Sequence, residues 1–90
     1  MSIICHAIGI GNEAGEVLGK LKKQIRDKGC DFKTQEFKEA MKKELGDVYW
    51  YLANTAEDLD LTLEEIAQAN IDKLQDRQKR GKLQGSGDNR

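Results

Sequence analysis

The stretch TQEFKEAMKKELGDVYWYLANTAEDL, residues 34–59, decides the fold of this 90-residue chain. Its apolar residues recur at steps of three and four, the spacing that places them on one face of an α-helix. That stripe consists of Phe37, Met41, Leu45, Val48, Leu52, Ala56 and Leu59. We expect a helix from about Thr34 to Leu59. The chain contains no proline and almost no strand-like alternation, so the predicted fold class is all-α.

A first helix precedes this stretch. It should begin near Asn12, a good N-cap residue, and end at about Lys28, where Gly29 offers a helix stop. Its apolar stripe is Ala14, Val17, Leu18, Leu21 and Ile25. The earlier segment MSIICHAIGIG is too short to span a bilayer, and its single histidine, His6, is expected to be partly buried or terminal rather than catalytic.

A third helix follows the long one. Thr62 is its expected N-cap, with Glu65 completing a capping box, and the helix should end near Gly81. Asn70 lies in the middle of its apolar stripe, with Lys73 and Arg77 on the same side. A buried amide needs partners, which could be a loop or the oxygen atoms of a phosphate or sugar. We interpret residues 1–80 as one helical domain and residues 81–90 as a polar tail.

Composition indicates a small domain that associates with itself. Apolar residues make up 38% of the chain, below the usual globular content of about 45 to 50%. A chain of 90 residues also buries only roughly 60% of the surface that its unfolded form exposes. The net charge of −1 gives no bulk attraction for nucleic acid or membranes. Cys5 and Cys30 lack metal-type spacing, and no secretory signal precedes them, so we expect reduced thiols in the cytoplasm.

Acidic residues flank the apolar stripes of the first two helices in matching patterns. The sequence NEAGEV contains Glu13 and Glu16, and KELGDV contains Glu44 and Asp47. If the two helices pack antiparallel, four carboxylates converge and need a counter-charge or raised pKa values. Mg²⁺ takes oxygen ligands of this kind. The plainer alternative is two solvated helix faces, with Glu16 and Lys20 forming an ordinary ion pair.

A glycine lies inside each acidic motif, at Gly15 and Gly46. Glycine weakens a helix interior by roughly 0.5 to 1 kcal/mol relative to alanine, so two copies at matching positions need a reason. They indicate either a close approach of the two helices or room for a ligand.

The order of these motifs resembles that of a known family. GNEAGEV, then KELGDVYWYLA, then LTLEEIAQANIDKLQDR are similar to the MazG-like nucleotide pyrophosphohydrolases of the all-α NTP pyrophosphatase superfamily. The ending RGKLQGSGDNR is similar to the tail of one subgroup. The resemblance extends from about Gly9 to Arg90.

The resemblance implies a helical bundle that forms homodimers or homotetramers and binds Mg²⁺, with Mn²⁺ as an alternative. Its ligands and catalytic residues would be Glu13, Glu16, Glu44 and Asp47. The implied reaction cleaves a nucleoside triphosphate between the α- and β-phosphates, which removes non-standard or surplus nucleotides. Lys20, Lys23, Tyr51, Asn70, Lys73 and Arg77 then become candidate substrate-binding residues, although Tyr51 could equally have a packing role. Trp50 is assigned to packing or to a subunit interface.

Family members usually carry a further helix before the first acidic motif, whereas only twelve residues precede it here. We expect that the sequence begins late or that another subunit fills the gap. Two alternatives stay open. One is an enzyme like phosphoribosyl-ATP pyrophosphatase, and the other is a non-catalytic helical module that oligomerises or binds nucleotides.

Overall fold

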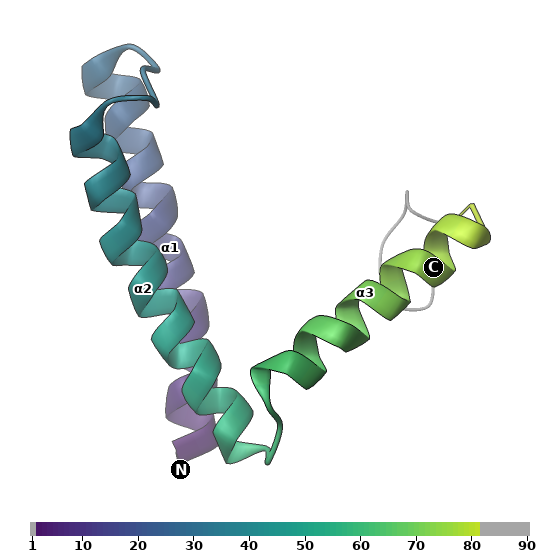
Figure 1. The fold of residues 1–90 in the computed structure, drawn as a ribbon. Helices are drawn as coiled ribbons and strands as arrows, with labels where there is room; N and C mark the ends of the chain where they lie inside the picture. The colour runs from purple at the N-terminus through teal and green to yellow at the C-terminus, as the bar shows by residue number, and fades with distance from the viewer. Residues whose placement is uncertain (1, 82–90) are drawn as a thin grey trace. The chain divides into compact units, whose positions relative to one another are not determined.

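The computed structural model describes residues 2–81, which form three helices and no strands (Figure 1). These are α1 (Ser2–Lys28), α2 (Gln35–Asp58) and α3 (Leu63–Lys79). The chain divides into two units, residues 1–60 with α1 and α2, and residues 61–90 with α3. No helix among the described residues combines the length and apolar character needed to cross a membrane. The all-α prediction is confirmed for this part of the chain.

Helix α1 is longer than the sequence predicts. It begins at Ser2 rather than at Asn12, which lies in the helix interior and caps nothing. Contacts with the last turns of α2 explain the extension: Nδ1 of His6 lies 2.6 Å from Oδ2 of Asp58, and the His6 ring meets the edge of Trp50. Tertiary packing of this kind outweighs the weak local preference of an Ile- and Gly-containing segment for a helix.

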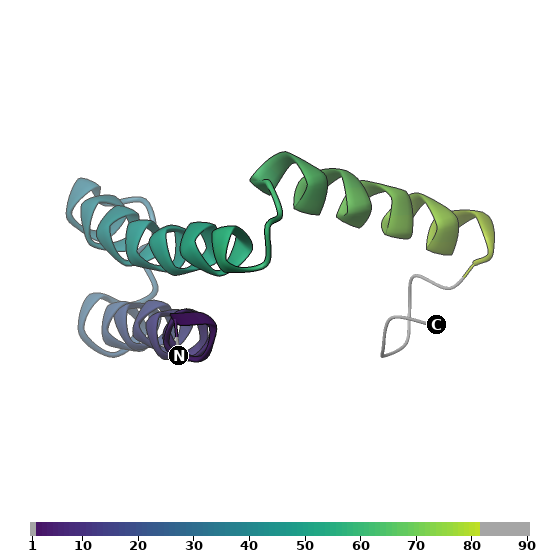
Figure 2. The ribbon, with the colours of Figure 1, turned by 90° about the horizontal axis from the view of Figure 1, so that it is seen from below.

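Helices α1 and α2 form an antiparallel hairpin, and both views show them side by side (Figures 1 and 2). The predicted stop at Gly29 is confirmed, because Gly29 and Cys30 adopt φ values of 62° and 65° and turn the chain. The buried side chain of Gln24 donates a hydrogen bond to the carbonyl of Asp31, which ties the loop back to α1. The loop is therefore held from inside the hairpin.

The predicted ends of the other two helices agree with the structure. Thr34 caps α2 by accepting a hydrogen bond from the amide of Phe37. Thr62 and Glu65 form the expected capping box at the start of α3, and α3 ends at Lys79 with Arg80 as its C-cap. In α3 itself, Asn70 is exposed rather than buried. Residues 82–90, most of the predicted tail, lie outside the described residues.

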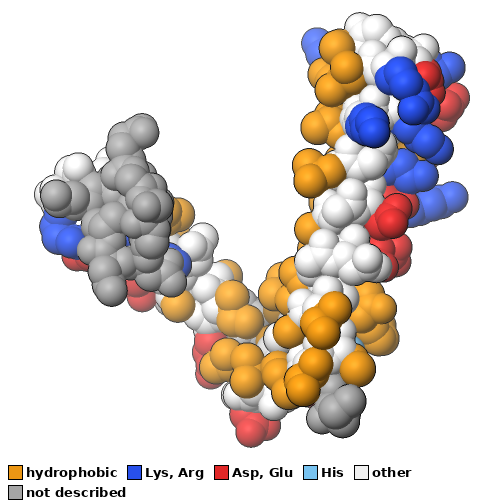
Figure 3. All heavy atoms as spheres, turned by 180° about the vertical axis from the view of Figure 1, so that it is seen from behind, with side chains coloured by type: hydrophobic (Ala, Val, Ile, Leu, Met, Phe, Trp, Pro, Cys, Tyr) orange, Lys and Arg blue, Asp and Glu red, His pale blue; other side chains and the backbone are white. Residues whose placement is uncertain are grey.

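The hairpin buries little apolar surface. Among the described residues, Ala56 is the buried hydrophobic side chain, while Ile8 and Leu18 on α1 are each 66% exposed and Leu45 on α2 is 52% exposed. In the part of the hairpin nearer the loop, Figure 3 shows hydrophobic side chains along one edge and charged side chains along the other; toward the start of α1, hydrophobic side chains lie on both edges. Much of the predicted apolar stripe is therefore available to a further surface.

Helix α1 lies close to a side chain of α2 at Gly9, which is buried. A Cβ atom added there would overlap the ring of Tyr51, whereas a Cβ at Gly15, Gly19 or Gly46 would meet open space. Close helix approach therefore involves Gly9 and not the two glycines of the acidic motifs. The explanation by close helix approach is therefore wrong for Gly15 and Gly46, both of which are exposed.

We predict that Gly9→Ala destabilises the protein by about 1 to 3 kcal/mol, the usual cost of overpacking a fitted contact. Gly19→Ala is the matched control on the same helix. It should stabilise by up to about 1 kcal/mol, because alanine is the better helix former and nothing obstructs its methyl group. Denaturant unfolding followed by circular dichroism measures both. Equal effects of the two substitutions would contradict the close contact.

Candidate metal centre

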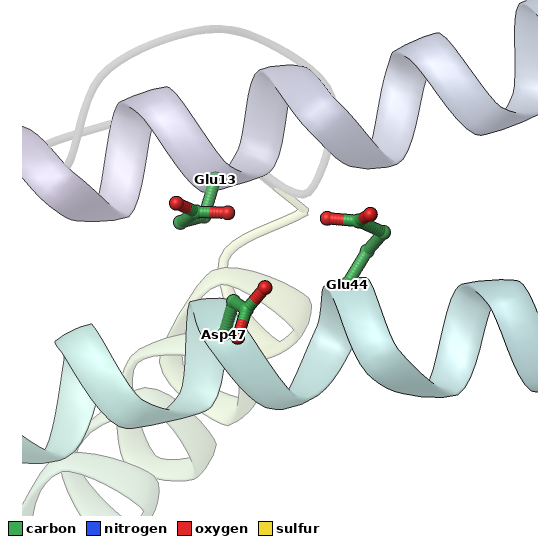
Figure 4. Close-up of side chains that lie close together, drawn as sticks. All are labelled: Glu13, Glu44 and Asp47. Carbon is green, nitrogen blue, oxygen red and sulfur yellow. The ribbon is translucent and has the colours of Figure 1, made fainter.

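Three of the four predicted acids gather between α1 and α2. Glu13 comes from α1, and Glu44 and Asp47 come from α2; one carboxylate oxygen from each lies within 4.8 Å of the others. Figure 4 shows the three side chains extending into the space between the two helices. Glu13 and Glu44 are half-buried and Asp47 is exposed, so the cluster is open to solvent on one side.

Helix geometry explains the gathering. Glu44 and Asp47 are three residues apart, which places them on adjacent turns of one face of α2. The antiparallel hairpin then sets Glu13 opposite this pair. The predicted position of the acids beside the apolar stripes is what allows packing to bring them together.

The cluster carries the electrostatic cost that like charges impose. Partial burial raises the pKa of the Glu13 carboxyl above its ordinary value of 4.5, and the negative charges of Asp47, Glu44 and Glu16 raise it further. A counter-charge lies nearby, because Nζ of Lys20 is 3.8 Å from Oε1 of Glu44. Both expected responses to crowded carboxylates, a raised pKa and a cation, are therefore present.

Glu16 lies one turn from Glu13 but outside the group of three. Its charge reaches Glu13, as the raised pKa of Glu13 reflects, while its side chain borders a small hollow with Gly19, Lys20 and Lys23. The structure thus places Glu16 beside the cluster rather than within its shared space. Lys20 on α1 forms an ion pair with Glu44 on α2.

Aromatic side chains border the cluster on the side toward the start of α1. The ring of Tyr51 rests against Gly9. Gly9 lies one turn before Glu13 on α1, and Tyr51 lies one turn after Asp47 on α2. Trp50 meets the Tyr51 ring edge-on with centroids 5.0 Å apart, and Trp50 itself is 54% exposed. Tyr51 therefore has the packing role that the sequence left open, in a position that also borders the acids.

The three candidates on α3 lie in the second unit of the chain. Asn70 is exposed, Lys73 is half-buried and Arg77 is buried. The carboxylate cluster and its neighbouring lysines are built from residues of the first unit alone.

The hairpin thus combines an oxygen-rich cluster with cationic side chains. Carboxylate oxygens are the ligands that hard divalent cations such as Mg²⁺ prefer, and lysines beside them suit phosphate oxygens. A partly open cluster also leaves space for water or a ligand oxygen. The fold and this site define a class, the helical proteins in which carboxylates of two antiparallel helices gather beside lysines.

Comparison with known proteins identifies the family. The MazG nucleotide pyrophosphohydrolase domain matches residues 7–81, and the chain belongs to this family. The Gene 37 protein of Mycobacterium phage L5 is 49% identical over 83 residues, which is 92% of this chain and 72% of the phage protein. No solved structure matches the chain.

Sequence reasoning missed three features that shape the site. Gly9 was overlooked because its partner, Tyr51, is far away in the sequence. The link between His6 and Asp58 joins the start of α1 to the end of α2, and helix periodicity carries no information about a contact between residues so far apart in the sequence. The burial of Gln24 was also unforeseen, although a glutamine among the lysines near the end of a helix was a usable signal.

We predict that Glu13→Gln raises the melting temperature of the protein near pH 7 in the presence of a chelator. The pKa of Glu13 is higher in the folded state than its ordinary value of 4.5. The folded protein therefore loses stability as the pH rises from 4.5 through the raised pKa, because the Glu13 carboxyl becomes ionised next to other negative charges. The gain should therefore shrink at about pH 4 and below, where the carboxyl is protonated in both states.

Glu39→Gln is the control for this prediction, because Glu39 already has partners in Gln35 and Lys42 on the exposed surface of α2. It should give no comparable gain at either pH. Thermal unfolding curves of the three proteins at both pH values provide the measurement. A Glu13→Gln gain independent of pH would contradict the repulsion.

Proposed function

We propose that this protein is a Mg²⁺-dependent nucleoside triphosphate pyrophosphohydrolase. It would release a nucleoside monophosphate and pyrophosphate and so remove non-standard or surplus nucleotides. The convergence of Glu13, Glu44 and Asp47 on one space is the observation that carries the proposal. Membership of the MazG family supports the same reaction class.

The residues have separate roles in this proposal. Glu13, Glu44 and Asp47 would hold the metal, with Mn²⁺ as an alternative ion, and Glu16 would complete the set from the adjacent turn. When bound, the cation neutralises phosphate charge and activates water. A carboxylate of the cluster would accept the proton of the attacking water, a role for which a raised pKa is favourable.

Cationic and aromatic side chains would bind the substrate around the acids. Lys20 and Lys23 would contact phosphate oxygens, and Tyr51 would border the nucleoside. We also assign Asn70, Lys73 and Arg77 on α3 to phosphate or sugar oxygens, in this chain or in an assembled oligomer, on the chemistry of their side chains. The resemblance of LTLEEIAQANIDKLQDR to the family supports that assignment.

A panel of ribo- and deoxyribonucleoside triphosphates with Mg²⁺, assayed for pyrophosphate release, tests the function. We expect turnover of at least one triphosphate and a loss of about 100-fold or more in kcat/KM for Glu44→Gln, because the substitution removes a metal-binding carboxylate. Lys38→Met changes an exposed residue outside the site and should retain activity.

No turnover above that of Glu44→Gln would overturn the proposal. Phosphoribosyl-ATP belongs in the same panel, since its preferential cleavage would place the protein in the other branch of the superfamily. Metal-dependent nucleotide binding without turnover would instead identify a non-catalytic module.

We also propose that the chain functions as a homodimer or homotetramer. The exposed Ile8, Leu18 and Leu45 lie on the hairpin and make burial against a second hairpin favourable, at roughly 25 cal/mol per Å² of apolar surface. A second copy presents the same face, which suits the self-complementary contact of a twofold dimer.

Light scattering coupled to size-exclusion chromatography tests the assembly. The expected mass is twice or four times the 10.1 kDa of the chain. Leu18→Asp should shift the protein toward the monomer, whereas Gln35→Asp, which adds the same charge at the start of α2, should not. A stable folded monomer of the unsubstituted chain would contradict the proposal.

A further inference from the structure

A second hollow lies between α1 and α2, nearer the hairpin loop than the acids. It has a volume of about 230 Å³ and is lined by Lys20, Lys23, Gln24, Asp27, Lys28, Glu36, Phe37 and Ala40. The two helices contribute differently, since α1 supplies the lysines and α2 supplies the apolar side chains Phe37 and Ala40. We refer to it as the lysine groove.

The charges around the lysine groove favour an anion. Three of its lining residues are lysines and two are acids. One of the acids, Asp27, is already engaged, because the guanidinium of Arg26 donates it two hydrogen bonds, of 2.8 and 3.1 Å. These hydrogen bonds, together with the charges of Arg26, Lys23 and Lys28, lower the pKa of Asp27. The lining residues together with Arg26 therefore carry more positive than negative charges.

Lys20 connects the lysine groove to the carboxylate cluster. It lines the groove, and its Nζ lies 3.8 Å from Oε1 of Glu44. Helical side chains tilt toward the N-terminus of their helix, so Lys20 and Lys23 lean back along α1 toward Glu13. Glu44 leans toward the loop for the same reason, because α2 runs in the opposite direction. An anion in the groove would therefore lie next to a cation held by the acids.

The volume of the lysine groove limits what it can hold. Pockets for drug-sized ligands typically measure about 300 to 1,000 Å³, so about 230 Å³ suits a compact anion better than a whole nucleotide. On the other side of the acids lie the rings of Tyr51, Trp50 and His6, which pack against one another. The α1–α2 interface thus runs from an aromatic end, past the acids, to a cationic end.

We propose that the lysine groove binds the diphosphate part of the substrate and the pyrophosphate that leaves. The triphosphate would then lie along the hairpin, with its nucleoside toward Tyr51 and its terminal phosphates toward Lys23. This inference rests on the proposed function and adds a direction to it.

This orientation of the triphosphate would favour the proposed reaction. The oxygen of water forms a bond to the α-phosphorus, and the bond from that phosphorus to the bridging oxygen breaks. The electron pair stays on the bridging oxygen, which leaves with the β- and γ-phosphates, and the proton of water passes to a carboxylate. Negative charge grows on the diphosphate, and the groove lysines lie where they would stabilise it.

Lys23→Met tests the lysine groove, with Lys38→Met as the matched control. Lys38 is exposed on the first turn of α2, beside the groove residue Phe37, but does not line the groove. Calorimetric titration with inorganic pyrophosphate and Mg²⁺ should show affinity about tenfold or more weaker for Lys23→Met, because a charge-assisted hydrogen bond is lost. The control should remain within about twofold of the unsubstituted chain, since its contribution is long-range and screened.

A nuclear magnetic resonance titration of the unsubstituted protein provides a second measurement. Inorganic pyrophosphate should shift the side-chain amide signal of Gln24 and the backbone signal of Ala40. Nucleoside monophosphates, the other products, should instead shift the backbone signals of Gly9 and Tyr51. The reverse pattern would overturn the proposed direction even if pyrophosphate binds.

The two proposals fail in different ways. If the protein hydrolyses nucleotides but Lys23→Met and Lys38→Met bind pyrophosphate equally well, the proposal for the lysine groove is wrong and the enzymatic proposal stands. If Lys23→Met binds pyrophosphate more weakly but the protein hydrolyses no triphosphate, the lysine groove is a diphosphate site and the enzymatic proposal is wrong.

Discussion

The repulsion between carboxylates held across the α1–α2 interface is the constraint on which the rest of the structure depends. Glu13 faces Glu44 and Asp47 because two helices of matched pattern pack antiparallel, and the charges of these two acids disfavour the ionised form of Glu13. The hairpin must therefore be held by contacts elsewhere. His6 with Asp58 fastens one end, and Gln24 with Asp31 fastens the other. Gly9 lets Tyr51 approach between the acids and the first of these contacts.

How far the sequence predicts this arrangement depends on the range of each interaction. Helix type, the caps at Thr34 and Thr62 and the stop at Gly29 depend on neighbours within a few residues, and all of them agree with the structure. Periodicity also placed Glu44 and Asp47 correctly on one face. The predicted start of α1 was wrong because the helix around His6 and Gly9 is stabilised by contacts with the last turns of α2. No local pattern carries that information.

The site shows the same division. That the acids of two helices meet could be predicted from a matched pattern plus antiparallel packing, but the group of three and the lateral position of Glu16 depend on the helix rotation about the contact at Gly9. The glycines inside the motifs can be noticed in the sequence, but the sequence does not show whether each one contacts the other helix. Gly9 and Gly15 look alike in a helix, and only the neighbouring Tyr51 ring distinguishes a contact from an open space.

A shallow core and a repulsive site belong together in this chain. In this hairpin the more buried positions include polar groups, among them Glu13, Glu44 and Gln24. Side chains such as Ile8, Leu18 and Leu45 remain on the outside. Further hydrophobic stabilisation is then available through contact with another surface, and the cation that we propose would offset the repulsion within. The proposed assembly and the proposed ligand would thus each add stability to the same antiparallel pair, and binding of one would favour the other.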